Sequence, residues 1–253
     1  MGLLVSIANQ KGGVGKSTLT NVLANYLYNN SDLSVIVVDG DYMQESLTGL
    51  RNDELKKFLK GCKALAESND IHYTEDLKAA YEKEFIDKCY KIVTRDPETI
   101  TQSLVDYRDQ YDCVLVDLPG NLGAEGVVGV YVTFDLIIVP TDLTFKDLDS
   151  TRRFLNMYDT RVRPIRMINK LPCNLYGVFN KVKANTIEFK ARDEKVLEHN
   201  LKIPFMHSYI TETTRLKRDD SSFEMISLDG LKNDKMIDNF CKEVIDLMKK
   251  ISS

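Results

Sequence analysis

The sequence predicts a single α/β domain built on a mostly parallel, twisted sheet with helices on both faces. A short apolar run at residues 3–8 precedes a glycine-rich loop, a helical pattern follows at 16–29, and a β-branched run comes at 35–38. Strand, helix and strand within about forty residues form a βαβ unit, which requires the two strands to be parallel. A length of 253 residues suits one domain of this class.

Three further strands are predicted where short apolar runs end in polar or turn residues, at 113–117, 136–140 and 176–181. Helical patterns at 146–158 and 186–199 separate the later elements. Ligands of open parallel sheets gather at the carboxyl ends of the strands. One edge of the molecule is therefore expected to hold the site, at the loops after Ala8, Val38, Val116 and Val139.

Residues 51–110 show helical spacing of their apolar positions without a strong strand pattern. We interpret them as a helical excursion from the main domain, because no linker rich in Pro and Gly bounds them. Residues 234–251 predict a terminal helix with one apolar face. The whole chain, 1–253, is thus expected to form one domain.

Composition excludes several classes of protein. The chain is 43% hydrophobic and 28% charged, which is typical of a soluble globular protein. Its apolar runs are far shorter than the ~18–20 residues of a bilayer span, and no secretory signal pattern is present. The cysteines form no CxxC or Cys/His cluster and are expected to be reduced, mostly buried thiols in a cytoplasmic protein; they lie at positions 62, 89, 113, 173 and 241.

The strongest functional signal is NQKGGVGKST at residues 9–18, between the first strand and the first helix. Its glycines allow the backbone amides to surround phosphate oxygens at a helix N-terminus. Lys16 would then reach the β- and γ-phosphates of a nucleotide, and the Ser17 hydroxyl would bind Mg²⁺. The expected nucleotide-binding residues of this loop are Lys11, Gly12, Gly13, Val14, Gly15, Lys16, Ser17 and Thr18.

The loop differs from the standard phosphate-binding loop in one respect. Gln10 occupies the place of the first glycine, and a second lysine, Lys11, follows it. This K-G-G-x-G-K-[ST] arrangement resembles the deviant Walker A motif of the ParA/MinD family of ATPases, and the likeness extends over most of the chain. The resemblance implies a P-loop NTPase domain and a face-to-face homodimer that forms on ATP binding, in which Lys11 reaches the partner's bound phosphates.

The segment VVDGD at residues 37–41 resembles the second-strand motif of that family. The resemblance implies that Asp41 helps to position the attacking water and that Asp39 lies near the magnesium ion. An aspartate pair after a strand is also a common helix cap, and this reading stays open.

Residues 112–120 resemble the family's Walker B strand and the switch that follows it, with Asp117 in the place of the aspartate that holds a magnesium-bound water. Asn180 resembles the residue that contacts the adenine base. With Mg²⁺ as cofactor, the implied activity is ATP hydrolysis, slow without a partner. The residues expected to take part in catalysis are Lys11, Lys16 and Asp41.

The charge of the chain is unevenly distributed. Residues 151–218 hold fifteen Lys and Arg against six Asp and Glu, although the whole chain has a net charge of −4. Such a segment suits sequence-independent contact with DNA phosphates. The segment at 210–216 resembles the family region that leads into the DNA-contacting surface. The candidate DNA-binding residues are Arg215, Lys217 and Arg218.

Several functions remain open at this stage. The first is a ParA-like partition ATPase that associates with the nucleoid in the cytoplasm and is reset when a ParB-like centromere-binding protein stimulates hydrolysis. The second is a MinD-like ATPase that cycles on a membrane through the terminal helix, which is the less favoured reading. A regulatory nucleotide switch is a third. A nitrogenase-type iron protein is disfavoured because the cluster-binding cysteines have no counterpart here.

Overall fold

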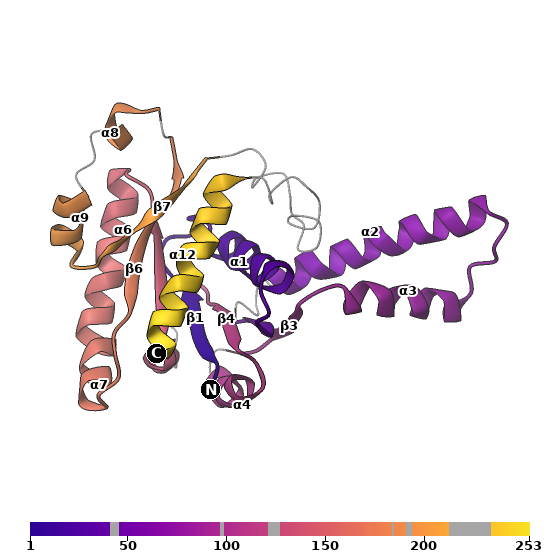
Figure 1. Cartoon of the computed structure of the whole chain (residues 1–253), viewed down its shortest axis with the longest axis horizontal. Coiled ribbons are helices and arrows are strands. Elements are labelled where there is room, and N and C mark those ends of the chain that lie inside the picture. The colour runs from indigo at the N-terminus through magenta and orange to yellow at the C-terminus, as the bar shows by residue number, and fades with distance from the viewer. Residues whose placement is uncertain (41–45, 97–98, 121–126, 184, 191–193, 213–233) are drawn as a thin grey trace.

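The computed structural model describes residues 1–40, 46–96, 99–120, 127–183, 185–190, 194–212 and 234–253 (Figure 1). Within these ranges, seven strands form one sheet of order β3-β2-β4-β1-β5-β6-β7, and every neighbouring pair is parallel. The strands are β1 (Leu3–Ile7), β2 (Val35–Asp39), β3 (Lys91–Thr94), β4 (Cys113–Asp117), β5 (Leu136–Thr141), β6 (Leu175–Val182) and β7 (Phe205–Thr211). The predicted α/β class with a parallel sheet is confirmed.

Helices cover both faces of this sheet. The larger apolar side chains of α1 (Lys16–Asn30) and α12 (Lys235–Ser252) pack on one face. Buried side chains of α4 (Ile100–Gln110), α5 (Val127–Thr133), α6 (Phe145–Met157), α8 (Ile187–Lys190) and α9 (Glu194–Leu201) pack on the other. A turn of π-helix (Tyr158–Val162) joins α6 to α7 (Arg163–Ile168).

The central strands are buried on both sides, which explains their unbroken apolar runs. Successive residues of β1 alternate between the two cores, so that Val5 packs with α1 and α12 whereas Leu4 packs with α4 and α5. The same alternation divides β2 and β4. Because neighbouring strands are all parallel, their carboxyl ends emerge together at one edge of the sheet.

Two strands were not predicted from the sequence. β3 has only four residues, is mostly half-exposed, and lies within the segment 51–110 that was expected to be helical. The helical prediction is therefore incomplete there, because a short edge strand has little apolar signal. β7 is the opposite edge strand, and exposed His207 interrupts its apolar residues.

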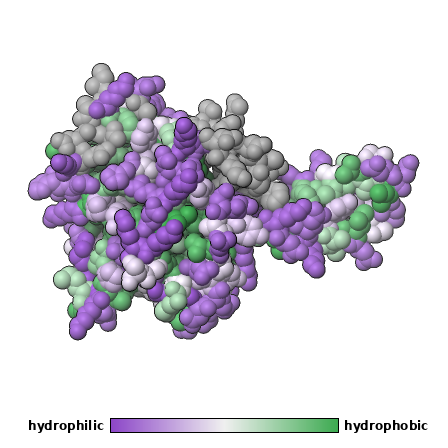
Figure 2. All heavy atoms as spheres, in the orientation of Figure 1, coloured by the Kyte–Doolittle hydropathy of each residue, from purple (hydrophilic) through white to green (hydrophobic). Residues whose placement is uncertain are grey.

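Before β3, the chain forms an arm of two helices, α2 (Ser46–Ser68) and α3 (Glu75–Asp87), which extends away from the sheet (Figure 1). Within the arm, the ring of Phe58 packs 5.3 Å from that of Phe85. Leu65, close to the end of α2, is exposed. Figure 2 shows hydrophobic surface on the far part of the arm.

The terminal helix α12 is amphipathic, and its apolar face lies against the body of the protein. Its side chains Phe240, Val244 and Leu247 are buried in the core that also contains α1. Tyr26 of α1 donates a hydrogen bond of 2.7 Å to Asp238, which ties the two helices together. Among the described helices, none has both the length and the hydropathy to cross a bilayer.

The five cysteines are free thiols. The prediction that most of them are buried is wrong, because Cys62, Cys89 and Cys173 are not among the buried residues of the two cores and are half-buried. Cys113 and Cys241 are buried, and burial raises the pKa of the Cys113 thiol to about 12. Cys113 is thus a core residue of β4, in agreement with its place in an apolar run.

One arginine of the basic segment has a structural role. The guanidinium of Arg166 in α7 is buried and donates hydrogen bonds to the carbonyls of Pro172 and Val132, at 2.8 Å for the Nε bond to Pro172. It joins the loop after α7 to the end of α5.

Arg166→Met should lower the free energy of unfolding by about 2–4 kcal/mol, because it leaves two buried carbonyls without their donor. Urea denaturation followed by circular dichroism measures this change. The matched control is Arg153→Met, since Arg153 is exposed and pairs with Asp149 on the surface of α6. That change is expected to stay within about 0.5 kcal/mol. Equal effects of the two substitutions would contradict the role of Arg166.

Candidate functional site

The loop between β1 and α1 has the backbone conformation that a phosphate-binding loop requires. Gly13 and Gly15 have φ values of 74° and 97°, in the region that favours glycine. Gly15 is the N-cap of α1 and provides no side chain, so the first amides of that helix have no side-chain cap. Open space surrounds the Cβ positions of Gly12 and Gly13. The loop therefore offers unobstructed backbone at a helix N-terminus, which suits an anion.

The end of β6 holds this loop in place. Asn180, expected to contact adenine, is buried, and its amide donates a hydrogen bond of 2.7 Å to the carbonyl of Val14. The ammonium of Lys181 donates to the carbonyl of Gly13. Lys181 has a positive φ of 58°, an uncommon conformation for a residue with a side chain. The bond made by Asn180 is a positioning contact, and its contact with a base remains a prediction.

A second asparagine, which the sequence analysis did not assign a role, holds the start of the loop. Asn9 is buried and donates hydrogen bonds of 2.8 Å to the carbonyl of Pro140 and 3.0 Å to the hydroxyl of Thr151. Its side-chain oxygen accepts the amide of Lys11 at 3.2 Å. The loop is thus connected to β5 and α6, which lie more than one hundred residues away in the sequence.

Lys11, the lysine that distinguishes this loop, forms an ion pair with Asp147 in the first turn of α6. The Lys11 side chain is 36% exposed, whereas that of Asp147 is 9% exposed. Thr144 is the N-cap of α6 and accepts the amide of Asp147, which fixes the position of the carboxylate. The Lys11 ammonium is therefore at the carboxyl edge of the sheet and is held there by its own chain.

Lys16 is folded against the loop. Its ammonium lies 3.4 Å from the carbonyl of Lys11. Gly120, which follows the Walker B-like strand, is so close that a Cβ atom there would be 2.8 Å from the carbonyl of Gln10 and 3.3 Å from the Lys16 ammonium. The loops after β1 and β4 are therefore in contact, as the carboxyl ends of neighbouring parallel strands predict.

Asp39 and Asp117 occupy paired register positions at the ends of β2 and β4, and both are buried. One oxygen of Asp39 accepts the amides of Leu47 and Thr48 at 3.1 and 3.0 Å, so this carboxylate caps the start of α2. This is the helix-cap reading that the sequence left open. Burial, with the nearby charge of Asp117 as a smaller cause, raises the pKa of the Tyr131 phenol.

The donor atoms at this edge suit Mg²⁺, which prefers oxygen ligands and usually retains waters and phosphate oxygens. Ser17 provides a hydroxyl at the start of α1, and Asp117 provides a carboxylate. Within the described ranges, no group of three or more His, Cys, Asp and Glu residues is arranged to hold a metal. The metal roles of Ser17, Asp39 and Asp117 remain predictions.

Four predicted site residues lie outside the described residues. These are Asp41, expected to position water, and the candidate DNA-binding residues Arg215, Lys217 and Arg218. Their roles stay predictions.

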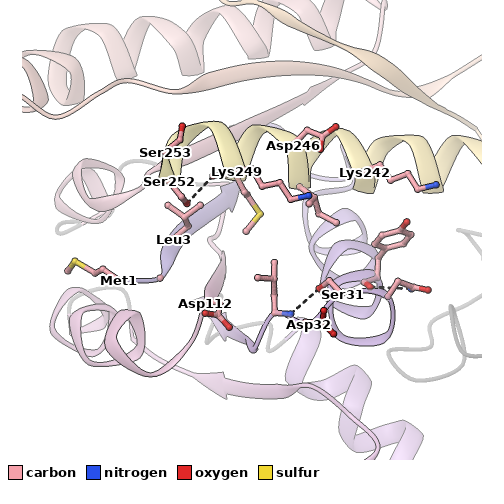
Figure 3. Close-up of a pocket in the computed structure, with 16 residues that line it drawn as sticks. Met1, Leu3, Ser31, Asp32, Asp112, Lys242, Asp246, Lys249, Ser252 and Ser253 are labelled. Carbon is pink, nitrogen blue, oxygen red and sulfur yellow. Dashed lines mark hydrogen bonds between the residues drawn. The ribbon is translucent and has the colours of Figure 1, made fainter.

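A cavity of about 920 Å³ lies far from this site, at the opposite end of β1 (Figure 3). The close-up shows Met1 and Leu3 on one side and the last turns of α12, with Lys249 and Ser252, on the other. None of the predicted nucleotide-binding residues lines this cavity. The site of interest is therefore the carboxyl edge of the sheet.

Comparison with known proteins agrees with this geometry. The AAA domain family matches residues 2–166. An uncharacterized ATP-binding protein of Methanocaldococcus jannaschii is 27% identical over 162 residues, which are 59% of this chain and 57% of that protein. The chain thus spans little more than half the length of this curated relative.

Two solved structures share the fold. The MinD cell division protein of Aquifex aeolicus is 17% identical, with a TM-score of 0.63 over 96% of this chain and 97% of that one. The pNOB8 ParA, solved bound to nonspecific DNA, is 20% identical, with a TM-score of 0.62 over 99% of both chains. These likenesses confirm the predicted P-loop NTPase fold.

Gly15→Ala should weaken the binding of ATP by about tenfold or more. The added methyl group would lie 2.5 Å from the Asn180 amide, and the φ of 97° is strained for alanine by about 1–2 kcal/mol. Isothermal titration calorimetry with a non-hydrolysable ATP analogue and Mg²⁺ measures the affinity. Gly61→Ala is the control, since open space surrounds Gly61 in α2. Unchanged affinity in Gly15→Ala would exclude this loop as the nucleotide site.

If the predicted nucleotide-dependent dimer forms, Asp147→Asn should strengthen it several-fold, because Lys11 no longer has to leave a carboxylate of its own chain. Sedimentation velocity over a concentration series measures the dimer dissociation constant. Asp149→Asn is the control. Asp149 lies two residues after Asp147 in α6 and pairs with exposed Arg153 instead of Lys11. Equal or weaker dimerisation in Asp147→Asn would show that the ion pair does not restrain Lys11.

Proposed function

The chain belongs to the AAA domain family, and we propose that it is a DNA partition ATPase of the deviant Walker A, ParA/MinD type. In this proposal, Mg²⁺ and ATP drive the formation of a homodimer that binds DNA without sequence preference. Hydrolysis, stimulated by a ParB-like centromere-binding protein, then releases the dimer from DNA. The observation that carries the proposal is the position of Lys11. Its side chain is partly exposed at the carboxyl edge of the sheet, beside the glycine-rich loop that Asn9 and Asn180 hold in place.

The nucleotide part of the proposal rests on the loop after β1. Its amides begin α1 without a side-chain cap, and Lys16 lies against it from the first turn of that helix. A triphosphate there would be met by an ammonium group and by aligned backbone dipoles, which is the charge neutralisation that phosphoryl transfer needs. Bound magnesium would add further positive charge to neutralise the phosphates. We assign Ser17 and Asp117 to its coordination and Asp41 to the attacking water.

The dimer part rests on Lys11. Its ammonium group is at the molecular edge rather than inside the loop, and the ion pair with Asp147 keeps it there. A lysine side chain that lies outside its own loop is well placed to contact phosphates held by a facing subunit.

The DNA part rests on the basic segment. Most of its described Lys and Arg side chains are exposed; the exceptions are half-buried Arg163 and buried Arg166. Exposed cations neutralise phosphates without reading bases, and a dimer doubles their number. The pNOB8 ParA was solved bound to nonspecific DNA, and we extend that property to this chain.

The alternative is a MinD-like ATPase that cycles on a membrane. Lys249 and Lys250 in the last turn of α12 would suit an anionic surface, and one solved structure with this fold is a MinD protein. The apolar face of α12, however, is occupied by contacts with the body, which leaves this helix little apolar surface for a bilayer. This observation favours the partition reading.

A DNA-retention assay with ATP, ADP or no nucleotide tests the proposal, with liposome pelleting in parallel. Retention is expected only with ATP. It should fall roughly a thousandfold between about 50 and 200 mM salt if the dimer makes about six phosphate contacts. Lys16→Ala should abolish it through loss of ATP binding, and Arg215→Glu should weaken it without a change in ATP affinity.

Lys249→Glu is the matched control for Arg215→Glu, since it makes the same charge change on α12. It should leave DNA retention unchanged. Retention that does not depend on nucleotide would contradict the partition cycle. ATP-dependent pelleting with liposomes, lost in Lys249→Glu, would instead select the MinD-like alternative.

A further inference from the structure

An aromatic side chain stands fully exposed at the same edge as Lys11. Phe145 is the first residue of α6, and 84% of its surface is accessible. It lies in the same helical turn as Asp147, which holds Lys11. Exposing a large aromatic ring to water costs free energy, at ~25 cal/mol per Å² of apolar surface. Contact with another protein at this edge would bury the ring and recover that free energy.

A cavity of about 510 Å³ opens at the start of α6, where Leu143 and Thr144, the two residues before Phe145, line it. Its apolar walls come from Leu143, Val182 and Phe189, and the hydroxyl-bearing Thr144 and Thr186 also line it. Cavities of about 150 Å³ are large enough to hold a benzene ring, so a phenyl group fits within this volume. Since Leu143 and Thr144 directly precede Phe145 in the chain, the ring and the cavity are adjacent parts of one surface.

The charges around the cavity are balanced. Lys181 and Lys183 line it together with Asp142 and Glu212, and the Lys183 ammonium lies 3.9 Å from the Glu212 carboxylate. A surface with both signs in equal number can meet a copy of itself without net repulsion. Two-fold symmetric interfaces need this property, because each subunit presents the same patch to the other.

We propose that Phe145 of one subunit inserts into this cavity of a second copy of the chain, and that the reciprocal contact forms at the same time. The two contacts are then the apolar anchors of the nucleotide-dependent dimer. This inference rests on the proposed function, since it concerns the dimer that ATP is proposed to form. The inference goes beyond the proposed function because it assigns an anchor residue and the cavity that receives it, both away from the phosphates.

The cavity is also linked to the nucleotide loop. Lys181 lines the cavity, and its ammonium donates to the carbonyl of Gly13 in the loop. A phosphate that enters the loop and changes the position of Gly13 would change the wall of the cavity through this one side chain. Through the hydrogen bond between Lys181 and Gly13, a nucleotide bound in the loop would change the shape of the cavity that receives the partner's Phe145 ring.

The first test is Phe145→Ala. It should raise the dissociation constant of the ATP-bound dimer by about tenfold to a hundredfold in sedimentation velocity, as expected for an aromatic anchor. ATP affinity of the monomer, measured by calorimetry, should change by less than about threefold. Ile168→Ala is the control, because Ile168 is 81% exposed on α7 and lines neither the cavity nor the nucleotide loop. It should not affect dimerisation.

A second test separates insertion from a general loss of apolar surface. Lys183→Trp places an indole at the cavity and should also impair the homodimer, because it obstructs the partner's ring. A mixture of the two variants should form a heterodimer, since the Phe145 of one subunit can enter the open cavity of the other. Native mass spectrometry with one isotopically labelled variant detects it.

The outcomes are distinguishable. A wild-type chain that remains monomeric with saturating ATP and Mg²⁺ overturns the proposed function and this inference together. A wild-type dimer that Phe145→Ala leaves unchanged overturns only the inference. A mixture of Phe145→Ala and Lys183→Trp that yields no heterodimer excludes insertion into the cavity.

Discussion

The hydrogen bonds of two buried asparagines determine the shape of the nucleotide loop. Asn9 fixes the loop to β5 and α6, and Asn180 fixes it to the end of β6. Both amides satisfy backbone carbonyls in places from which water is excluded, so the loss of either leaves a buried group unpaired. Gly13 and Gly15 allow the backbone conformation of the loop, and the hydrogen bonds of the two side-chain amides stabilise it. The loop is therefore organised by the chain itself, which would lower the entropic cost of binding a ligand there.

The central part of the fold could be predicted from the sequence because its determinants are local. The strands β1, β2 and β4 are buried on both faces and hence contain continuous apolar runs, and the glycine-rich loop between β1 and α1 has its own pattern. The edge strand β3 could not be predicted, since Lys91 is exposed and only four residues pair. Its position depends on the register with β2, which places Thr94 opposite Asp39.

For the candidate site, the sequence predicts the edge of the sheet at which its residues lie, but not the contacts among them. The motif residues identify the carboxyl edge, but the contacts that organise it join residues far apart in the chain. The ion pair between Lys11 and Asp147 spans 136 positions, and the hydrogen bond between Asn180 and Val14 spans 166. No local spacing encodes such pairs. Asp39 shows the same limit, because the amides that it caps belong to a helix whose start the sequence pattern does not mark.

The capping bond of Asp39 has a mechanical consequence for the arm formed by α2 and α3. α2 has 23 residues and is therefore about 34 Å long as a straight helix. Its first amides are attached to a carboxylate at the end of β2, whereas its other end extends away from the sheet (Figure 1). A rotation of about 5° at this attachment displaces the far end by about 3 Å, given that length. A small rotation of α2 about its attachment to Asp39 would therefore move the far end of the arm by about the length of a side chain.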